Sequence, residues 1–412
     1  MTTVSRRDTV HSGSQPHAYR LTLLVAFSFV VLVAARWHDY QWDFYLAYGS
    51  GKDFLHGVSP YRGAGLSFYQ APLTLYFYGL TARLPFLLAY ELWLVLKLCA
   101  LYCLLWIWDR HFLRLARTWW MVVYFVLAYA GTMYADLVSG NVSIFEQLGL
   151  WVGFVALLRG HYLRFCVCLI LVSQFKLTPM LFSVLLLLVP RVPRWKWFML
   201  CWTGFGAVAA LTLVLQPTLL RQFLHAAPTL DERGTQNPST LAFLRDAADL
   251  LRGVGYSATT HIDEVAFIVV VVAISAVTLL MLRRHRADVG EIDPRVVIYV
   301  SCVAYCLLVP RLKSYSYIIL LVPTLQLLRL LPRRTLIAAA MGALAAVVVF
   351  PHGGSLLPFH SLAELFYDYL PLAAAFAVWL GYMAVLGQPR ALQLDAGAHV
   401  TSAPGGRVEP PP

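Results

Sequence analysis

The sequence predicts an all-α polytopic membrane protein, and three observations lead to that prediction. The 412-residue chain is 59% hydrophobic, and its mean hydropathy is +0.67. Charged residues make up 13% of the chain, against roughly 25% in soluble domains. The apolar residues gather in long runs, such as 21–35, 265–282 and 338–350, and a spanning helix needs about 20 mostly apolar residues. This pattern excludes a soluble domain.

The positive charge is distributed as in a membrane protein. The net charge is +11 at pH 7, and the basic residues lie in short segments between the apolar runs. Cytoplasmic loops that face anionic lipid carry such an excess. We therefore expect membrane lipids, and no nucleic acid, as partners.

The seven cysteines all lie inside apolar stretches. Cys99 with Cys103, and Cys302 with Cys306, have the one-turn helical spacing that suits a pair of metal ligands. No histidine or carboxylate lies nearby in sequence to complete such a site, so the pattern favours packing. The sequence predicts no metal site and no cofactor.

The distribution of basic residues sets the order of the first elements. Residues 1–20 carry Arg6, Arg7 and Arg20 and are expected to form a cytoplasmic tail. The span at 21–35 then crosses the membrane, so the loop at 36–70 is expected on the external side. The loop at 109–118 is basic and is expected on the cytoplasmic side. Only an odd number of crossings can connect it with the external loop at 36–70, and one crossing is the simplest solution. We therefore expect an interfacial or re-entrant helix at 71–84 and a span at 87–108. Irregular backbone at that depth must line a cavity or be covered by protein.

The remaining apolar runs alternate across the membrane. Residues 165–189, broken at Lys176, lie between two basic loops and predict a short helical hairpin with Lys176 near its outer apex. A long external loop follows at 216–264. The other crossings are expected at 119–135, 142–158, 198–215, 265–282, 296–309, 314–331, 336–350 and 362–386. The whole is one transmembrane domain over 21–387 with about 11–12 spans, and 388–412 form a disordered cytoplasmic tail.

Polar residues of catalytic type fall on the outer side of this topology. They lie in the loop at 36–70, at residues 139–141, in the loop at 216–264 and at residues 311–315. Acidic, amide and cationic groups beside a cavity open to lipid suit a substrate with a lipid tail, a phosphate and a polar head.

Several short motifs in this order resemble one known family. Asp43 is followed by Gly57-Val58-Ser59-Pro60-Tyr61 and by Tyr69-Gln70-Ala71-Pro72. The sequence resembles glycosyltransferase family 87, membrane enzymes of the GT-C fold, whose pattern is Asp after the first helix, Gly-x-x-Pro-Tyr and Tyr-x-Pro-Pro. Ala71 replaces the first proline of the last motif.

The later motifs continue the resemblance. Gly140-Asn141-Val142-Ser143 stands where the family has Gly-Gln-x-Asn, and Lys176-Leu177-Thr178-Pro179 matches Lys-x-x-Pro. Gln236-Asn237-Pro238-Ser239-Thr240 is similar to the family's Asn-Gln-Ser loop. The resemblance covers roughly residues 20–330.

The resemblance implies a GT-C-like bundle that uses a polyprenyl-phosphate sugar, with Asp43 as general base. A carboxylate has to take the proton from the acceptor hydroxyl, and cations have to stabilise the departing phosphate. An inverting single displacement needs no second carboxylate as nucleophile. Asp39, one turn before Asp43, is the competitor for the role of base.

The other candidate residues were chosen for charge or for hydrogen bonding. Lys313 and Arg311 are the first choices for the donor phosphate, with His225, Arg245 and Lys176 after them. Candidate sugar or acceptor ligands are Asn141, Tyr61, Tyr69, Gln236 and Asn237.

Each of these residues also has a structural interpretation. Lys313 and Arg311 are equally explained by snorkelling to headgroups, and Asn141 by capping the helix that begins at residue 142. Lys176 is equally explained by holding carbonyls freed by the proline at 179. Lys97 and a glutamate at 146 lie within spans and are costly to bury singly, so either they pair with each other or they face a polar cavity.

The resulting hypothesis is a glycosyltransferase of a bacterial inner membrane, with its active site on the periplasmic or extracytoplasmic side. It transfers a hexose from a polyprenyl-phosphate donor to a lipid or glycan acceptor; the resemblance implies mannose, with arabinose as the alternative. Two rival functions stay open. One is a transporter or flippase of lipid-linked sugars, although no internal repeat is visible. The other is a non-catalytic subunit of an envelope-polysaccharide complex.

Overall fold

The structure is a computed structural model, and it describes eight stretches of the chain. These are residues 42–61, 70–113, 119–190, 192–226, 232–253, 261–290, 292–330 and 365–388. Several predictions lie outside them: the first span at 21–35, the span at 336–350, Asp39, Tyr69 and the two tails.

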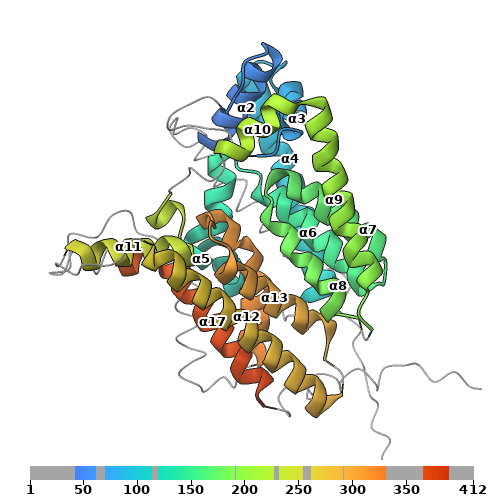
Figure 1. The fold of residues 1–412 in the computed structure, drawn as a ribbon, viewed down its shortest axis with the longest axis vertical. Helices are drawn as coiled ribbons and strands as arrows, with labels where there is room; N and C mark the ends of the chain where they lie inside the picture. The colour runs from blue at the N-terminus through green and yellow to red at the C-terminus, as the bar shows by residue number, and fades with distance from the viewer. Residues whose placement is uncertain are drawn as a thin grey trace, which may run out of the picture.

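Every regular element in these stretches is a helix, which confirms the all-α class (Figure 1). The α-helices are α2 (Trp42–Leu55), α3 (Thr74–Thr81), α4 (Phe86–Ile107), α5 (Trp119–Ser139), α6 (Ser143–Leu158), α7 (Tyr162–Phe175), α8 (Leu185–Leu188), α9 (Trp195–Leu215), α10 (Pro217–Ala226), α11 (Thr240–Gly253), α12 (Ile262–Val289), α13 (Pro294–Leu308), α14 (Leu321–Leu330) and α17 (Leu370–Leu386). Shorter helical turns are η1 (Trp108–Phe112), η2 (Thr178–Val184), η4 (Gly234–Gln236) and η5 (Ser314–Leu320).

Three helices in the described part of the chain are long and apolar enough to cross a membrane. They are Phe86–Phe112, Trp195–Leu215 and Ile262–Val289. A fourth crossing results if Tyr124–Ser139 and Ser143–Leu158, which meet at 113°, form one broken span. The chain is therefore a multi-pass membrane protein, and the expected total of 11–12 spans stays a prediction.

A cap of short helices lies at one end of the molecule (Figure 1). There α2 packs on α3, and α10 follows directly from the end of α9. A Cβ on Gly51 would collide with the backbone carbonyl of Tyr78, so glycine permits the close approach of α2 to α3. The eight-residue α3 is too short to span, which agrees with the interfacial or re-entrant helix expected at 71–84.

The predicted hairpin at 165–189 is present as two short arms. Helix α7 ends at Phe175, and Lys176 has an extended conformation. The chain then returns through η2, which packs against α7, and through the four-residue α8. This agrees with the expected break at Lys176, because neither arm has the length of a full crossing.

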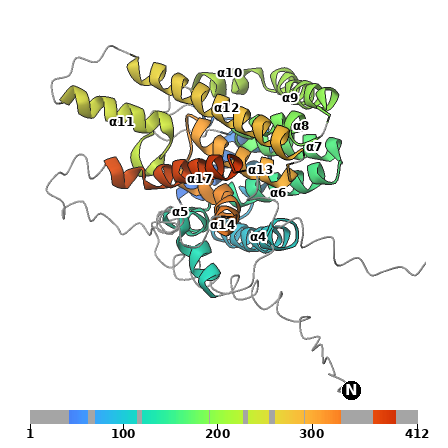
Figure 2. The ribbon, with the colours of Figure 1, turned by 90° about the horizontal axis from the view of Figure 1, so that it is seen from below.

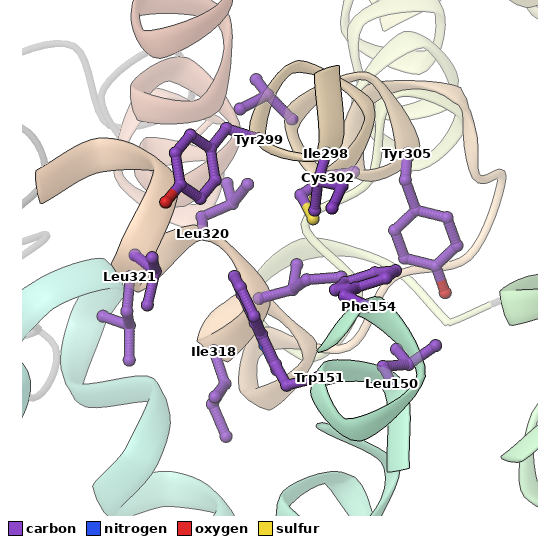
Figure 3. Packing of buried hydrophobic residues seen from close by; sticks show 14 of the residues in the cluster. Leu150, Trp151, Phe154, Ile298, Tyr299, Cys302, Tyr305, Ile318, Leu320 and Leu321 are labelled. Atoms are coloured by element: carbon purple, nitrogen blue, oxygen red, sulfur yellow. The ribbon is translucent and has the colours of Figure 1, made fainter. Parts of the chain in front are cut away.

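The main core lies where α6, α13 and η5 meet (Figure 3). Trp151 and Phe154 of α6 are fully buried there, and so are Ile298 and Cys302 of α13 and Ile318 of η5. In the view of Figure 2, α17 runs alongside α13 and α14, with which it is in contact. Helix α13 starts with a proline at its first position and with a side-chain cap from Asp293, a combination that favours a helix start.

Helices α5 and α6, expected as separate crossings at 119–135 and 142–158, form a sharply bent pair, and their separate crossings stay a prediction. The two helices meet at 113° across residues 140–142. Gly140, with a φ of 71°, makes the turn. Two helix ends thus meet at the break, and each leaves backbone groups without intrahelical partners.

Candidate active site

Asp43 is in the first turn of α2 and lies against the α5–α6 break. Its Oδ2 accepts a hydrogen bond of 3.0 Å from Nδ2 of Asn141. Among the described residues, Oδ1 of Asp43 receives no hydrogen bond, and the side chain is partly exposed. One carboxylate oxygen is therefore anchored, and the other is available.

Glycine at position 140 allows α2 to approach the α5–α6 break closely enough for this hydrogen bond. A Cβ on Gly140 would lie 2.6 Å from the Cβ of Phe44, which is closer than real Cβ contacts. The carbonyl of Gly140 also accepts a hydrogen bond of 2.8 Å from Nε1 of Trp93 on α4. The glycine thus joins α2, α4 and the break in one place.

A fully buried ion pair lies directly below the break. Nζ of Lys97 lies 2.8 Å from Oδ2 of Asp136, and neither side chain is exposed. The same ammonium donates to the carbonyl of Asp136 and, at 2.7 Å, to that of Asn141. The interpretation in which Lys97 pairs with Glu146 is wrong, because Asp136 is its partner.

Glu146 pairs instead with Lys176, at the break in the hairpin. Nζ of Lys176 lies 2.6 Å from Oε2 of Glu146, and donates to Oγ of Ser143 at 2.8 Å and to Oγ of Ser316 at 3.1 Å. Two N–H groups of the ammonium thus donate to serine hydroxyls, and the contact with Glu146 is an ion pair. Lys176 therefore holds α6 and η5 together, and its partners are side chains rather than the carbonyls that sequence reasoning suggested.

Arg311 and Lys313 form a second charged cluster with Glu232. Oε2 of Glu232 accepts from Nε of Arg311 at 3.0 Å and from Nη2 at 2.7 Å, and Oε1 accepts from Nζ of Lys313 at 2.6 Å. Burial alone raises the pKa of the Glu232 carboxyl, but the two cations outweigh it and lower the pKa below its ordinary value. Glu232 therefore stays ionised near neutral pH.

Asn237 holds the loop that carries this cluster. Its Oδ1 accepts from the backbone N–H of Leu312 at 2.7 Å, and its Nδ2 donates to the carbonyl of Glu232 at 2.9 Å. It is also buried. Both ends of its amide are used within the protein, so Asn237 positions the loop in this structure.

Tyr315, the second residue of η5, is close to Lys176 and is affected by charges of both clusters. The ammonium of Lys176 lies 5.5 Å from the centre of its ring. The charges of Asp43 and Glu232 both act on its phenol. Lys176, which donates to Ser143 at the α5–α6 break and to Ser316 in η5, also connects the break with the segment that follows Arg311 and Lys313. We treat α2, the break and the segment that leads into η5 as one candidate site.

The remaining predicted residues are not gathered at this site. Tyr61 is buried, donates to the carbonyl of Gln70 at 2.8 Å and packs against Phe223. Arg245 pairs with two acidic residues at the start of α12, at 3.2 and 3.6 Å. His225 on α10 and Gln236 in η4 are exposed.

Sequence reasoning missed Asp136 and the partnership of Glu232 with the two cations. A lone lysine inside the apolar run at 87–108 signals a carboxylate partner on a neighbouring span, and Asp136 is the carboxylate near the end of the next apolar helix. In the described stretches, no group of three or more His, Cys, Asp or Glu side chains is placed to hold a metal ion.

The fold and the site together define a class of membrane protein. The chain is an all-helical, multi-pass membrane protein with a charged site at one end, where a short-helix cap meets a broken helix pair. The model of glycosyltransferase family 87 matches residues 68–310, more than half of the chain, and the protein belongs to that family. It is a membrane glycosyltransferase, which acts on a sugar donor and an acceptor. No curated protein matches the chain.

The matched region bears on the candidate residues. It contains Asn141, Lys176 and Glu232, whereas Asp43 precedes it and Arg311 and Lys313 follow it directly. The roles of Asp43, Arg311 and Lys313 thus depend on the geometry described above.

Proposed function

We propose that this protein transfers a sugar from a polyprenyl-phosphate donor to the hydroxyl of a lipid or glycan acceptor, with inversion. The observation that carries the proposal is one site with two parts: a carboxylate with one available oxygen on Asp43, and a cationic pair at Arg311 and Lys313. A displacement at an anomeric carbon needs a base on one side and a stabilised leaving group on the other.

In the proposed reaction, Oδ1 of Asp43 takes the proton of the acceptor hydroxyl. The hydroxyl oxygen forms the new bond to the anomeric carbon as the bond to the phosphate oxygen breaks. The negative charge that grows on the phosphate faces Lys313, which makes one hydrogen bond to described residues and retains two N–H donors. The proton stays on Asp43 until water removes it.

The three hydrogen bonds of Glu232 bear on how the donor binds. A phosphate that reaches Arg311 and Lys313 competes with a carboxylate already bound to both. We propose that the phosphate displaces Glu232 from at least one of the two cations. His225, Arg245, Tyr61, Tyr69 and Gln236 stay secondary candidates for substrate contact.

The proposed setting is a bacterial inner membrane, with the loops at 36–70 and 216–264 on the extracytoplasmic face of a single transmembrane domain. The proposed sugar is mannose, and arabinose is the alternative. Lys176 is already held by Glu146, Ser143 and Ser316, so we assign it to electrostatic support of the phosphate.

The test is transfer by purified protein from a radiolabelled polyprenyl-phosphate sugar to membrane lipids. Labelled mannose and labelled arabinose donors are compared in parallel. Movement of intact donor between leaflets, without labelled product, would favour the flippase instead. Labelled product that needs a second protein would favour the non-catalytic subunit.

The decisive variant is Asp43→Asn, which keeps the shape of the side chain and removes its basicity. A positioned general base contributes about 10²–10⁴-fold, so transfer should fall by about that factor while donor binding survives. Asp53→Asn, an exposed site on the same helix, is the matched control. Asp39→Asn tests the competing carboxylate; an inactive Asp39 variant beside an active Asp43 variant would reassign the base.

A further inference from the structure

The buried pair of Lys97 and Asp136 satisfies the two helix ends at the α5–α6 break. The last four carbonyls of α5 lack the usual backbone partner within the helix. The carbonyl of Asp136, one of them, accepts from the N–H of Asn141 at 3.3 Å and from the hydroxyl of Ser139 at 3.4 Å. Lys97 donates to that carbonyl and to the carbonyl of Asn141. On the other side, Oδ1 of Asp136 accepts the N–H of Ser143, the first residue of α6, at 3.0 Å.

A structural pair of this kind is costly in a membrane. Both side chains are 0% exposed, and desolvation of two charges offsets most of their mutual attraction. Apolar side chains of similar size often replace buried ion pairs without loss of stability. Lys97 holds the carbonyl of Asn141, the residue that binds the candidate base, and this connection suggests a role beyond stability.

The amide of Asn141 is held in one orientation. Its Oδ1 accepts from the N–H of Ser143 at 3.1 Å and from the hydroxyl of Ser143 at 3.0 Å. Both are acceptor contacts, so the oxygen must face Ser143 and the NH₂ group must face Asp43. Its backbone carbonyl is fixed by Lys97 at the same time. The backbone and the side chain of Asn141 are therefore both held by residues other than Asp43.

We propose that Asn141, with the Lys97–Asp136 pair behind it, is the positioning device for the base of the transfer reaction. Asn141 fixes Oδ2 of Asp43 and so directs Oδ1 toward the acceptor, and Lys97 fixes Asn141. This assignment rests on the proposed function, and it replaces a sugar-binding role for Asn141 by a positioning role.

The test compares Asn141→Leu with Asn141→Asp in steady-state transfer. The first variant removes the N–H donor, and the second places a carboxylate against Asp43. We expect kcat to fall about tenfold in Asn141→Leu while the KM for the donor changes less than about twofold. The acid limb of the pH–rate profile should move to higher pH in both variants, and further in Asn141→Asp, because a second negative charge disfavours ionisation of the base.

Other groups near Asp43 contribute to that pH profile. Tyr78 on α3, Lys97 on α4 and Tyr315 in η5 all interact with its charge. The two Asn141 variants leave these three groups in place, so a difference between the variants reports the contact with position 141.

A double variant tests the contribution of the buried Lys97–Asp136 pair. Lys97→Met with Asp136→Asn removes both charges together, so no single buried charge is left unpaired, and the amide at 136 can still accept from Ser143. We expect the protein to fold, with kcat reduced about tenfold and the donor KM unchanged. Lys196→Met, at an exposed position at the start of α9, is the control for loss of a lysine.

The outcomes separate the two proposals. An inactive Asp43→Asn with unchanged kcat and pH profile in both Asn141 variants overturns the positioning device and leaves the proposed function standing. A fully active Asp43→Asn overturns the proposed function itself. Reduced kcat with an unmoved acid limb in both Asn141 variants also overturns the device, because a purely structural defect gives that result.

Discussion

Replacement of Glu232 by glutamine should strengthen donor binding, which is the reverse of the usual effect of removing a site residue. Glu232 holds Arg311 and Lys313 through three charge-assisted hydrogen bonds. A donor phosphate competes for the same N–H groups. Glu232→Gln keeps the size of the side chain and removes the charge that the phosphate has to displace.

The magnitude follows from the geometry of the cluster. Two unit charges about 4 Å apart attract by about 4 kcal/mol at an effective dielectric constant of about 20. The side chains of Glu232, Lys313 and Arg311 are 19%, 23% and 32% exposed, so solvent screens part of that attraction. The amide of glutamine also retains weaker hydrogen bonds to the cations. A net gain of about 1–3 kcal/mol remains, which corresponds to about 5–150-fold in the donor Kd.

The assay is equilibrium binding of a labelled polyprenyl-phosphate sugar to protein in detergent at pH 7. Asp288→Asn is the control, because Asp288 also pairs with an arginine, Arg284, but is 47% exposed and lies near the end of α12. A Kd for Glu232→Gln that equals or exceeds the wild-type value would refute the competition. Glu232 would then be needed to hold the cations in place for the phosphate.

Further predictions concern packing, the phosphate cation and topology. Gly140→Ala combines a positive φ with a collision against Phe44, and should lower stability by at least about 1–3 kcal/mol in thermal unfolding; Gly206→Ala, in open space, should not. Lys313→Ala should raise the donor KM more than Lys313→Arg does, because the latter keeps the charge; equal values would argue against a phosphate contact. Pro193→Cys, in a cysteine-free background, should resist an impermeant thiol reagent in intact cells, and labelling there would place that loop outside.

Much of the architecture was predictable because it depends on local properties of the chain. The short helix α3 and the break at Lys176 follow from the lengths of apolar runs and the positions of basic loops. Both are consequences of bilayer thickness and of the charge rule for loops. The same reasoning placed Asp43 beyond the first apolar run and near the outer site.

The pairing of the buried charges was not predictable from the sequence. Lys97 and Lys176 each have more than one carboxylate that a helical bundle can bring within reach. The choice of Asp136 for the first and Glu146 for the second depends on the 113° bend, which no local pattern indicates. The bend itself comes from the turn at Gly140, and hydropathy alone interprets its two arms as separate crossings.

The sequence indicated Arg311 and Lys313 as a cationic pair, but it did not indicate that Glu232 binds both of them. Glu232 precedes Arg311 by 79 positions, and only the loop held by Asn237 brings them together. Sequence motifs indicate which residue types a site contains. They do not show which of those residues are already bound to one another before a substrate arrives.

The α5–α6 break has a consequence for the mutational landscape of this chain. Within one short stretch, five residues each make a specific contact or leave a specific space: Asp136, Gly140, Asn141, Ser143 and Glu146. On α9, in contrast, most side chains lie outside the protein interior, and one aliphatic side chain substitutes for another. A saturation scan should therefore show a dense band of intolerance over residues 136–146, whereas α9 should tolerate exchange among aliphatic residues. Variation between related chains should be lowest at that band, and a search for distant relatives gains most from weighting it.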